Sequence, residues 1–164
     1  QMCIRDRYTS DPAFITKPSE MNKKWQEENK DVEFELQDTP LRAKFPIVET
    51  ILNDLPKENI HRIRFMKLKP GGGELERHTD QVDADSGIGD GQLMRLHYPV
   101  VTNDKVEFTC WTPSDTQVVN MKLGEMWFLD TRKPHRAVNG GDEERTHLVV
   151  DVEANDETRA LLVS

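Results

Sequence analysis

The chain has 164 residues, 35% of them hydrophobic and 32% charged, and its 22 basic and 30 acidic residues give a formal net charge of −8. This length fits one domain, and the acidic balance argues against partnership with nucleic acid or with anionic lipid. Because no apolar run reaches the roughly 20 residues of a membrane helix and only two cysteines occur, we expect a cytoplasmic protein of a reducing compartment.

The first part of the chain predicts helices. Residues 1–7 (QMCIRDR) resemble a translated sequencing adaptor, so we expect them to be non-native or disordered and residues 8–164 to form one domain. Residues 19–30 predict a short surface helix, since Met21 and Trp25 stand four apart in a polar segment. Residues 46–56 predict an amphipathic helix that begins at Pro46.

The remainder of the chain predicts strands. Segments rich in β-forming residues cover residues 61–68, 93–101, 106–111, 117–123, 125–130 and 146–152. The glycines at 71–73 indicate a turn, and Asn155 is suited to cap a final helix that runs to residue 162. Strands this short and closely spaced favour a mainly β sandwich or barrel over a fold of alternating strands and helices.

Two of the predicted strands place basic residues together. Because side chains alternate along a strand, Arg95 and His97 share one face, and the apolar residues Met94, Leu96, Tyr98 and Val100 take the other. Arg145 and His147 alternate in the same way in the last strand. Such residues are usually solvated, but inside a barrel they would form a positive pocket that fits a carboxylate.

A metal site is predicted by three residues. In extended backbone His78 and Asp80 project to the same side, and His135 offers a third ligand after a later strand. Two histidines and one carboxylate form the facial triad typical of non-haem Fe(II), which leaves coordination positions open. Arg145 stands ten residues after His135, so we expect its guanidinium beneath the metal, paired with the far carboxylate of a dicarboxylic co-substrate.

Five segments, taken in order, resemble a known family. They are His78-Thr79-Asp80, Arg95-Leu96-His97-Tyr98-Pro99-Val100 and residues 124–130, 134–139 and 145–152. In their order and spacing the chain resembles the Fe(II)- and 2-oxoglutarate-dependent oxygenases, and more narrowly the aspartyl/asparaginyl β-hydroxylases, which include proline hydroxylases. The resemblance implies a double-stranded β-helix (a cupin-like jelly roll) with flanking N-terminal helices and a core over about residues 61–152.

The same resemblance implies the roles of individual residues. It implies His78, Asp80 and His135 as Fe(II) ligands, Arg145 as the partner of the 2-oxoglutarate C5 carboxylate, and Arg95 with His97 near the metal-chelating end of that co-substrate. The implied reaction consumes O2, hydroxylates an unactivated C–H bond of a free amino acid or an Asp/Asn-type residue, and releases succinate and CO2.

Other interpretations stay open at this point. A cupin-like protein can bind a metal or a small acid without turnover, because a fold does not fix a function. A zinc hydrolase with the same ligands is weaker, since it gives Arg95 and Arg145 no role. Trp111 and Arg136 are candidate substrate contacts, although a core tryptophan and a solvated arginine are the simpler interpretations. The short chain favours a small amino acid over a peptide as substrate.

Overall fold

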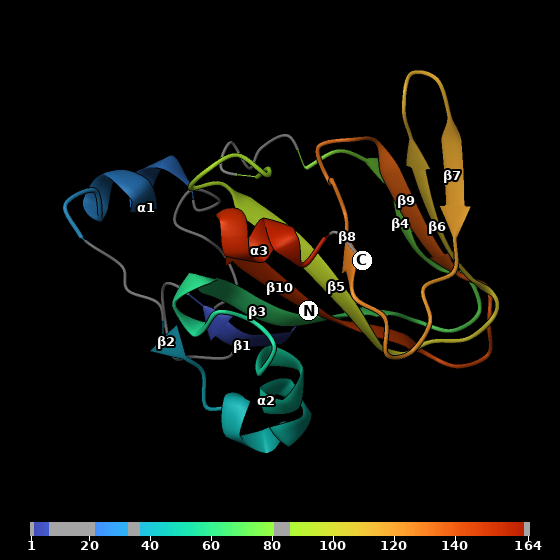
Figure 1. Ribbon diagram of the computed structural model, residues 1–164, viewed down its shortest axis with the longest axis horizontal. Helices are drawn as coiled ribbons and strands as arrows, with labels where there is room; N and C mark the ends of the chain where they lie inside the picture. The colour runs from blue at the N-terminus through green and yellow to red at the C-terminus, as the bar shows by residue number, and fades with distance from the viewer. Residues whose placement is uncertain (1, 7–21, 33–36, 81–85, 163–164) are drawn as a thin grey trace.

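The computed structural model describes residues 2–6, 22–32, 37–80 and 86–162, which form two β-sheets with short helices beside them (Figure 1). None of the helices in these ranges has the length and apolar character needed to cross a lipid bilayer. The helices are α1 (Lys23–Glu28), α2 (Pro46–Leu52) and α3 (Asp156–Ala160), with two short 3-10 turns, Arg42–Lys44 and Lys57–Asn59.

The larger sheet has the strand order β2-β1-β3-β10-β5-β8 and the smaller sheet the order β4-β9-β6-β7. The strands of the larger sheet are β1 (Met2–Asp6), β2 (Gln37–Asp38), β3 (Ile60–Leu68), β5 (Leu93–Val101), β8 (Trp127–Phe128) and β10 (Arg145–Glu153). Those of the smaller sheet are β4 (Gly73–His78), β6 (Val106–Trp111), β7 (Thr116–Val119) and β9 (His135–Asn139).

From β3 onward, successive strands alternate between the two sheets, apart from the hairpin of β6 and β7. All the paired strands are antiparallel. This alternation defines the double-stranded β-helix, so the predicted fold class is confirmed by the topology.

Several strand boundaries differ from the expected ones. β7 ends at Val119 and β8 covers only Trp127–Phe128, because the chain turns between them. In that turn Gly124 adopts a φ of 83°, and the Glu125 carboxylate accepts hydrogen bonds from the Lys122 backbone and the Trp127 indole. Strands β4 and β9 were not predicted. In β4, charged residues obscure the alternation of apolar side chains.

The helices are shorter than expected. α2 ends at Leu52, and the turn that follows leads to Pro56, whose ring disfavours helical backbone at the residue before it. α1 covers the middle of its predicted range, of which residues 19–21 lie outside the described residues. Residues 2–6 form strand β1, which pairs with β2 and β3. That residues 1–7 are foreign to the protein stays a prediction, and residues 1 and 7 lie outside the described residues.

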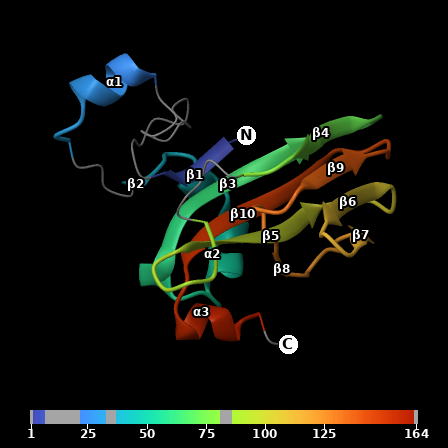
Figure 2. The same ribbon diagram turned by 90° about the horizontal axis from the view of Figure 1, so that it is seen from above.

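The main apolar core lies on the outer face of the larger sheet, where α2 packs; α3 lies on the same side (Figure 2). We call this group the outer cluster. Its strand residues include Leu148, Val150 and Val152, and none of these is exposed. Its buried members are Val48, Leu52, Leu55, Ile60, Ile63, Phe65, Met94, Leu96, Leu148, Val150, Val152 and Ala154. A smaller cluster combines Phe108 of β6 and Ala137 of β9 with Met121 and Leu129 from the segments that flank β8.

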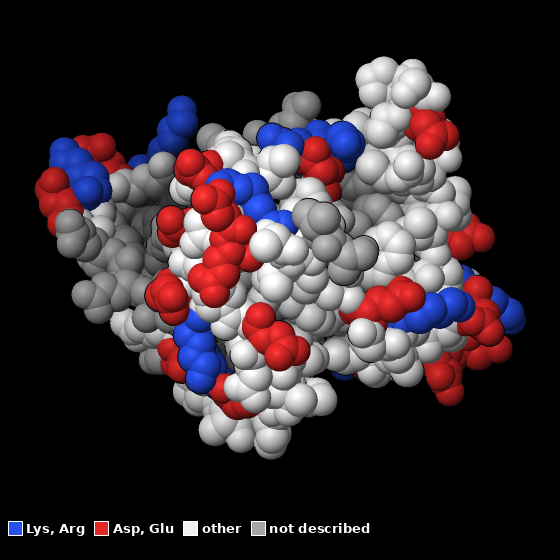
Figure 3. Space-filling model, viewed as in Figure 1, with Lys and Arg blue, Asp and Glu red and all other residues white. Residues whose placement is uncertain are grey.

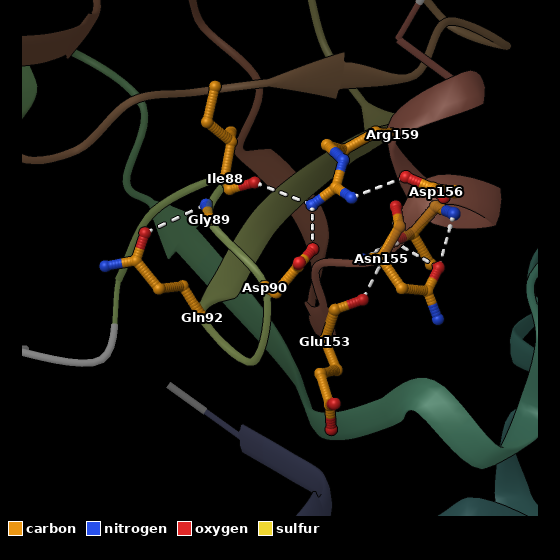
Figure 4. A network of polar contacts seen from close by, with 9 residues as sticks. Ile88, Gly89, Asp90, Gln92, Glu153, Asn155, Asp156 and Arg159 are labelled. Carbon is orange, nitrogen blue, oxygen red and sulfur yellow. Dashed lines mark hydrogen bonds and ion pairs between the residues drawn. The ribbon is translucent and has the colours of Figure 1, made fainter.

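Hydrogen bonds between the N-cap residue and the first turn fix the start of helix α3 (Figure 4). The Thr158 backbone N–H donates to Asn155 Oδ1 at 2.9 Å, and the Asn155 N–H donates to Thr158 Oγ1 at 2.9 Å, so the predicted cap is confirmed as a capping box. Arg159 donates to the Ile88 carbonyl at 3.1 Å and contacts Asp90 at 2.7 Å. These contacts connect α3 to the segment that leads into β5.

Candidate active site

A cavity of about 580 Å³ is lined by residues of both sheets. The six residues expected to bind the metal and the co-substrate come from four strands and one loop. All of them line this cavity: His78, Asp80, Arg95, His97, His135 and Arg145. Residues far apart in the sequence are therefore brought to one place by the alternation of strands between the sheets.

Three side chains, those of His78, Asp80 and His135, converge so that they could bind one metal ion. His78 ends β4 and His135 begins β9, and the two residues are cross-strand partners with ring centroids 4.3 Å apart. Asp80 follows β4, and its backbone N–H donates to the Thr131 carbonyl at 2.8 Å. His78 Nε2 lies 3.3 Å from Asp80 Oδ1, and one ligand atom from each of the three residues lies within 4.8 Å of the others.

Backbone contacts fix the tautomers of both histidines. His78 Nδ1 lies 2.7 Å from the Glu76 carbonyl, and His135 Nδ1 lies 2.9 Å from the Lys133 carbonyl. A carbonyl only accepts, so each Nδ1 carries a proton, and Nε2 is the ring atom of each histidine that can bind a metal. Burial lowers the pKa of His135, which favours the neutral form that a metal requires. Two imidazole nitrogens and one carboxylate oxygen suit a divalent first-row transition metal.

Arg95 orients the carboxylate of this set. Its Nη1 donates to Asp80 Oδ2 at 2.6 Å, which leaves Oδ1 on the side of His78. Its Nε donates to Asp151 Oδ1 at 2.8 Å, and Arg64 Nη1 donates to Asp151 Oδ2 at the same distance. Burial alone would raise the pKa of Asp151, but Arg64 and Arg95 hold it well below its usual range.

Arg145 is a buried cation that has no counter-ion among the described residues. It is 5% exposed and lines the cavity, and its Nε has no hydrogen-bond partner. Among the described residues no carboxylate lies within ion-pair distance of its guanidinium. Burial lowers its pKa to about 10, so it stays charged at neutral pH. Because an uncompensated buried charge is costly, this position favours an anionic ligand. On the face shown in Figure 3, by contrast, basic and acidic side chains are interspersed.

His97 and His147 form a buried pair beside Arg145. Their Nδ1 atoms lie 3.4 Å apart, and neither Nε2 has a partner among the described atoms. Burial, reinforced by Arg145, lowers the pKa of both, that of His147 to about 2. Both rings are therefore neutral at physiological pH. His97 lines the cavity and can offer Nε2 to a ligand.

The two candidate substrate contacts lie elsewhere. Arg136 pairs with Glu74, and the Arg77 guanidinium lies 4.3 Å over the Trp111 ring. Neither Trp111 nor Arg136 is among the described residues that line the cavity. That they contact substrate stays a prediction, and the structure gives both another partner.

Arg62 and Arg64 were not predicted, and Asp151 was placed on the same strand face as Arg145 but without a role; all three are buried. Arg62 and Arg64 line the cavity from β3, in which the alternate residues Ile63 and Phe65 belong to the outer cluster. The same alternation that identified Arg95 and His97 was therefore present in β3 and could have revealed them.

Comparison with known proteins gives the family. The family model for aspartyl/asparaginyl β-hydroxylase matches residues 14–155, which include every residue of the ligand set. The chain belongs to this family. It is also 34% identical over 77 residues to an L-proline cis-4-hydroxylase of Rhizobium meliloti (strain 1021), a match that covers 47% of this chain. The chain spans about a quarter of the length of that relative, 24%.

Solved structures are similar at low sequence identity. A cupin domain from Bordetella pertussis Tohama I shares 16% identity with a TM-score of 0.40, over 61% of this chain and 88% of that one. A non-heme monooxygenase, ThoJ, in its nickel complex shares 12% identity with a TM-score of 0.49, over 71% of this chain and 54% of that one.

Proposed function

We propose that this member of the aspartyl/asparaginyl β-hydroxylase family is an Fe(II)- and 2-oxoglutarate-dependent dioxygenase that hydroxylates an amino acid or an Asp/Asn-type residue. One observation carries the proposal: a single cavity holds three converging ligand atoms from His78, Asp80 and His135 together with a buried arginine, Arg145, that has no counter-ion among the described residues. The first feature suits a metal ion, and the second suits the far carboxylate of a dicarboxylic acid.

Each residue then has a distinct task. His78, Asp80 and His135 hold Fe(II), which with 2-oxoglutarate supplies the O2-dependent oxidation that yields succinate and CO2. Arg145 receives the C5 carboxylate of the co-substrate and orients it. Arg95 holds one oxygen of Asp80 so that the other faces the ion. The neutral His97 sits near the chelating end of the co-substrate.

Apolar side chains complete the site. Phe108, Leu129 and Ala137 line the cavity, and all three are at least nine-tenths buried. The Phe108 ring stacks on His135, with centroids 5.8 Å apart and an interplanar angle of 27°. These contacts keep the histidine in place and exclude water from one side of the site.

A small free amino acid is the substrate class that we favour. The relative from Rhizobium meliloti is an L-proline hydroxylase, and the cavity is of a size that holds a small co-substrate and a small substrate together. A cupin-like protein that binds the metal and the acid without turnover is the alternative, and the experiment below distinguishes the two.

The test starts from the metal-free protein without oxygen. Fe(II) and then 2-oxoglutarate are added while the visible spectrum is recorded. We expect a charge-transfer absorption band that requires both additions, is absent in Arg145→Ala, and persists in Arg132→Ala, whose guanidinium pairs with Asp130 outside the cavity.

Succinate is then measured after oxygen is admitted. We expect succinate to form with the wild type and to fall at least about 1,000-fold in His78→Ala, since a ligand has been removed from the ion. An active His78→Ala variant contradicts the ligand assignment. A band without any succinate supports the binding protein instead.

A further inference from the structure

His97 and His147 lie against each other on the cavity face of the larger sheet, and the proposed function gives a task only to His97. They are diagonal neighbours in the strand register, because His97 pairs with Val149 while His147 pairs with Pro99. Their ring centroids are 5.6 Å apart at an interplanar angle of 76°. Of the two residues, His97 lines the cavity and His147 does not. His147 therefore lies behind His97, away from any ligand of the cavity.

The two rings contact each other through their Nδ1 atoms. These atoms are 3.4 Å apart, and among the described residues neither ring makes another hydrogen bond. Burial, reinforced by the charge of Arg145, lowers the pKa of both histidines, so both rings are neutral at physiological pH. Two bare nitrogens or two N–H groups would repel each other here, whereas one N–H and one lone pair form a hydrogen bond. One histidine therefore carries its proton on Nδ1 and the other carries it on Nε2.

The surroundings of His147 decide which ring donates. If His97 donated, His147 would carry its proton on Nε2, where it has no acceptor among the described residues. That N–H would be a buried donor without a partner, close to the positive charge of Arg145. If His147 donates, its Nε2 is a bare nitrogen, which a neighbouring cation favours and which costs less than an unpaired N–H. The contact therefore favours His147 as the donor and His97 as the acceptor.

The tautomer of His97 is then opposite to that of the two histidines in the ligand set. His78 and His135 place Nδ1 against a backbone carbonyl, so their Nε2 atoms can bind a metal. His97 places Nδ1 against the N–H of His147, so its own proton is on Nε2 and that atom cannot bind a metal. His97 can instead donate a hydrogen bond to a ligand oxygen. The partner of Nδ1 thus decides whether a histidine of this cavity binds a metal or a carboxylate.

Folding alone does not account for a histidine at position 147. The side chain is fully buried, and its Nε2 has no partner among the described residues. Burial of such a polar atom destabilises the folded state, and an apolar side chain of similar size would avoid that cost. Val149, on the same face of β10, is apolar and fully buried. The histidine at position 147 therefore points to a role in the cavity.

We propose that His147 is a positioning residue for the co-substrate: it donates its Nδ1 proton to His97 and so holds His97 in the Nε2–H tautomer that donates to 2-oxoglutarate. The proposal rests on the proposed function and adds a residue to it. Because His147 does not line the cavity, it acts only through His97. Without this hydrogen bond His97 exchanges between two tautomers, and only the fraction in the donating tautomer is competent to bind.

Nitrogen NMR of the protein with isotope-labelled histidine tests the tautomers directly, because N–H and bare imidazole nitrogens have widely separated chemical shifts. The signals that disappear in His97→Gln and in His147→Asn assign the two rings. Spectra are recorded without metal and with Zn(II), a diamagnetic ion that accepts the same ligand types. We expect His97 to be protonated on Nε2 and His147 on Nδ1 in both states. Addition of 2-oxoglutarate to the Zn(II) protein should shift the His97 Nε2–H signal and leave both tautomers unchanged.

Variants at position 147 then connect the tautomer to binding, with substrate-free succinate formation as the assay. In His147→Leu we expect the KM for 2-oxoglutarate to rise about 5-fold and kcat to stay within about two-fold, because part of His97 adopts the other tautomer. The free energy of unfolding should not fall, since an unpaired polar atom is replaced by an apolar group. His147→Asn, whose amide N–H can take the place of Nδ1–H, should bring KM back to within about two-fold of the wild type. Val150→Ala on the outer face is the control, which loses stability and keeps KM.

Three results would overturn the proposal. They are reversed tautomers in the two rings, a His147→Leu variant that keeps the wild-type KM for 2-oxoglutarate, and a KM that rises equally in His147→Leu and His147→Asn. The charge-transfer band of the wild type reports separately on the proposed function. If the band forms while the tautomers are reversed, only the role of His147 fails. If no band forms, the proposed function fails and the assignment of His147 to the co-substrate fails with it.

Discussion

The two faces of strand β10 are both buried but chemically opposite. Along β10, Leu148, Val150 and Val152 belong to the outer cluster under α2. On the other face Arg145 lines the cavity, while His147 and Asp151 contact cavity-lining residues, His97 in the one case and Arg64 with Arg95 in the other. Every residue of β10 except the last is buried. Burial alone therefore does not separate stabilising positions from functional ones. The outer face gains free energy from apolar contacts, while the inner face carries charges that folding does not require.

This contrast shows how the chain can hold reactive groups in place. The outer cluster fixes the position of β3, β5 and β10 without using their inner faces. Charged side chains on those inner faces are then oriented by a rigid sheet, although several of them destabilise the fold by their burial. Substitutions on the two faces should therefore differ in their effects on the free energy of unfolding and on activity.

The largest effect on stability is expected for Asp151→Asn. The change leaves the buried guanidinium groups of Arg64 and Arg95 without the carboxylate that they share, and uncompensated buried charge costs about 3–5 kcal/mol. Denaturant titration of the purified protein measures the free energy of unfolding. Glu144→Gln is the matched control, because Glu144 pairs with Lys67 at the surface and its loss leaves stability essentially unchanged. Equal stability of the two variants would contradict the shared-carboxylate role.

A slightly smaller loss is expected for Leu148→Ala on the opposite face. Leu148 is fully buried in the outer cluster, and truncation of such a residue costs about 2–5 kcal/mol. The substrate-free succinate rate below the melting temperature should persist, since the side chain points away from the cavity. Val118→Ala, at a position that is 57% exposed, should change stability by less than about 0.5 kcal/mol. Loss of activity in folded Leu148→Ala would show that the two faces are not independent.

The smallest effect concerns pH. His97 and His147 have lowered pKa values in the folded state, while unfolded histidine titrates near 6.5. The unfolded state therefore binds more protons, so their contribution is complete above about pH 6.5 and is lost as the pH falls below it. Arg145, Arg95 and Arg64 face the pair and act in the same direction. Each histidine should cost about 1.4 kcal/mol per pH unit.

The comparison is between wild type and His147→Gln, unfolded by denaturant at pH 7, 6 and 5. We expect the variant to lose about 2 kcal/mol less than the wild type between pH 7 and 5. Parallel curves for the two proteins would show that folding does not lower the pKa of His147.

Much of the fold was predictable because apolar alternation is strong in the long strands. β3, β5 and β10 were expected within one or two residues, and these strands supply the outer cluster. β4 was missed because its residues between Gly73 and His78 are mostly charged and exposed, so no apolar face marks it. Its place is set by pairing with β9, a long-range contact that no local pattern records.

The candidate site was predictable to the same extent: local motifs revealed some of its residues, and contacts that depend on strand pairing were not visible in the sequence. The short motif around His78 and the spacing of His135 and Arg145 could be read along the chain, and the structure brings these residues into one cavity. The contact between Arg95 and Asp151 could not be predicted, because the two residues lie 56 positions apart and their contact depends on strand register. Trp111 was a candidate on residue type alone, and the cation of Arg77 that covers it is visible only in the folded chain.

The meeting of β3 with β10 also has a consequence for the timing of folding. Arg64 and Asp151 stand 87 residues apart, and the strands between them must be placed before their ion pair can close. Sheets built from such distant segments form slowly, because loop-closure entropy is lost before the contacts form. During synthesis, Arg64 must remain without its partner Asp151 until β10 leaves the ribosome. The chain therefore cannot form its cavity early, and a ligand of the cavity could stabilise the fold only after the two sheets have closed.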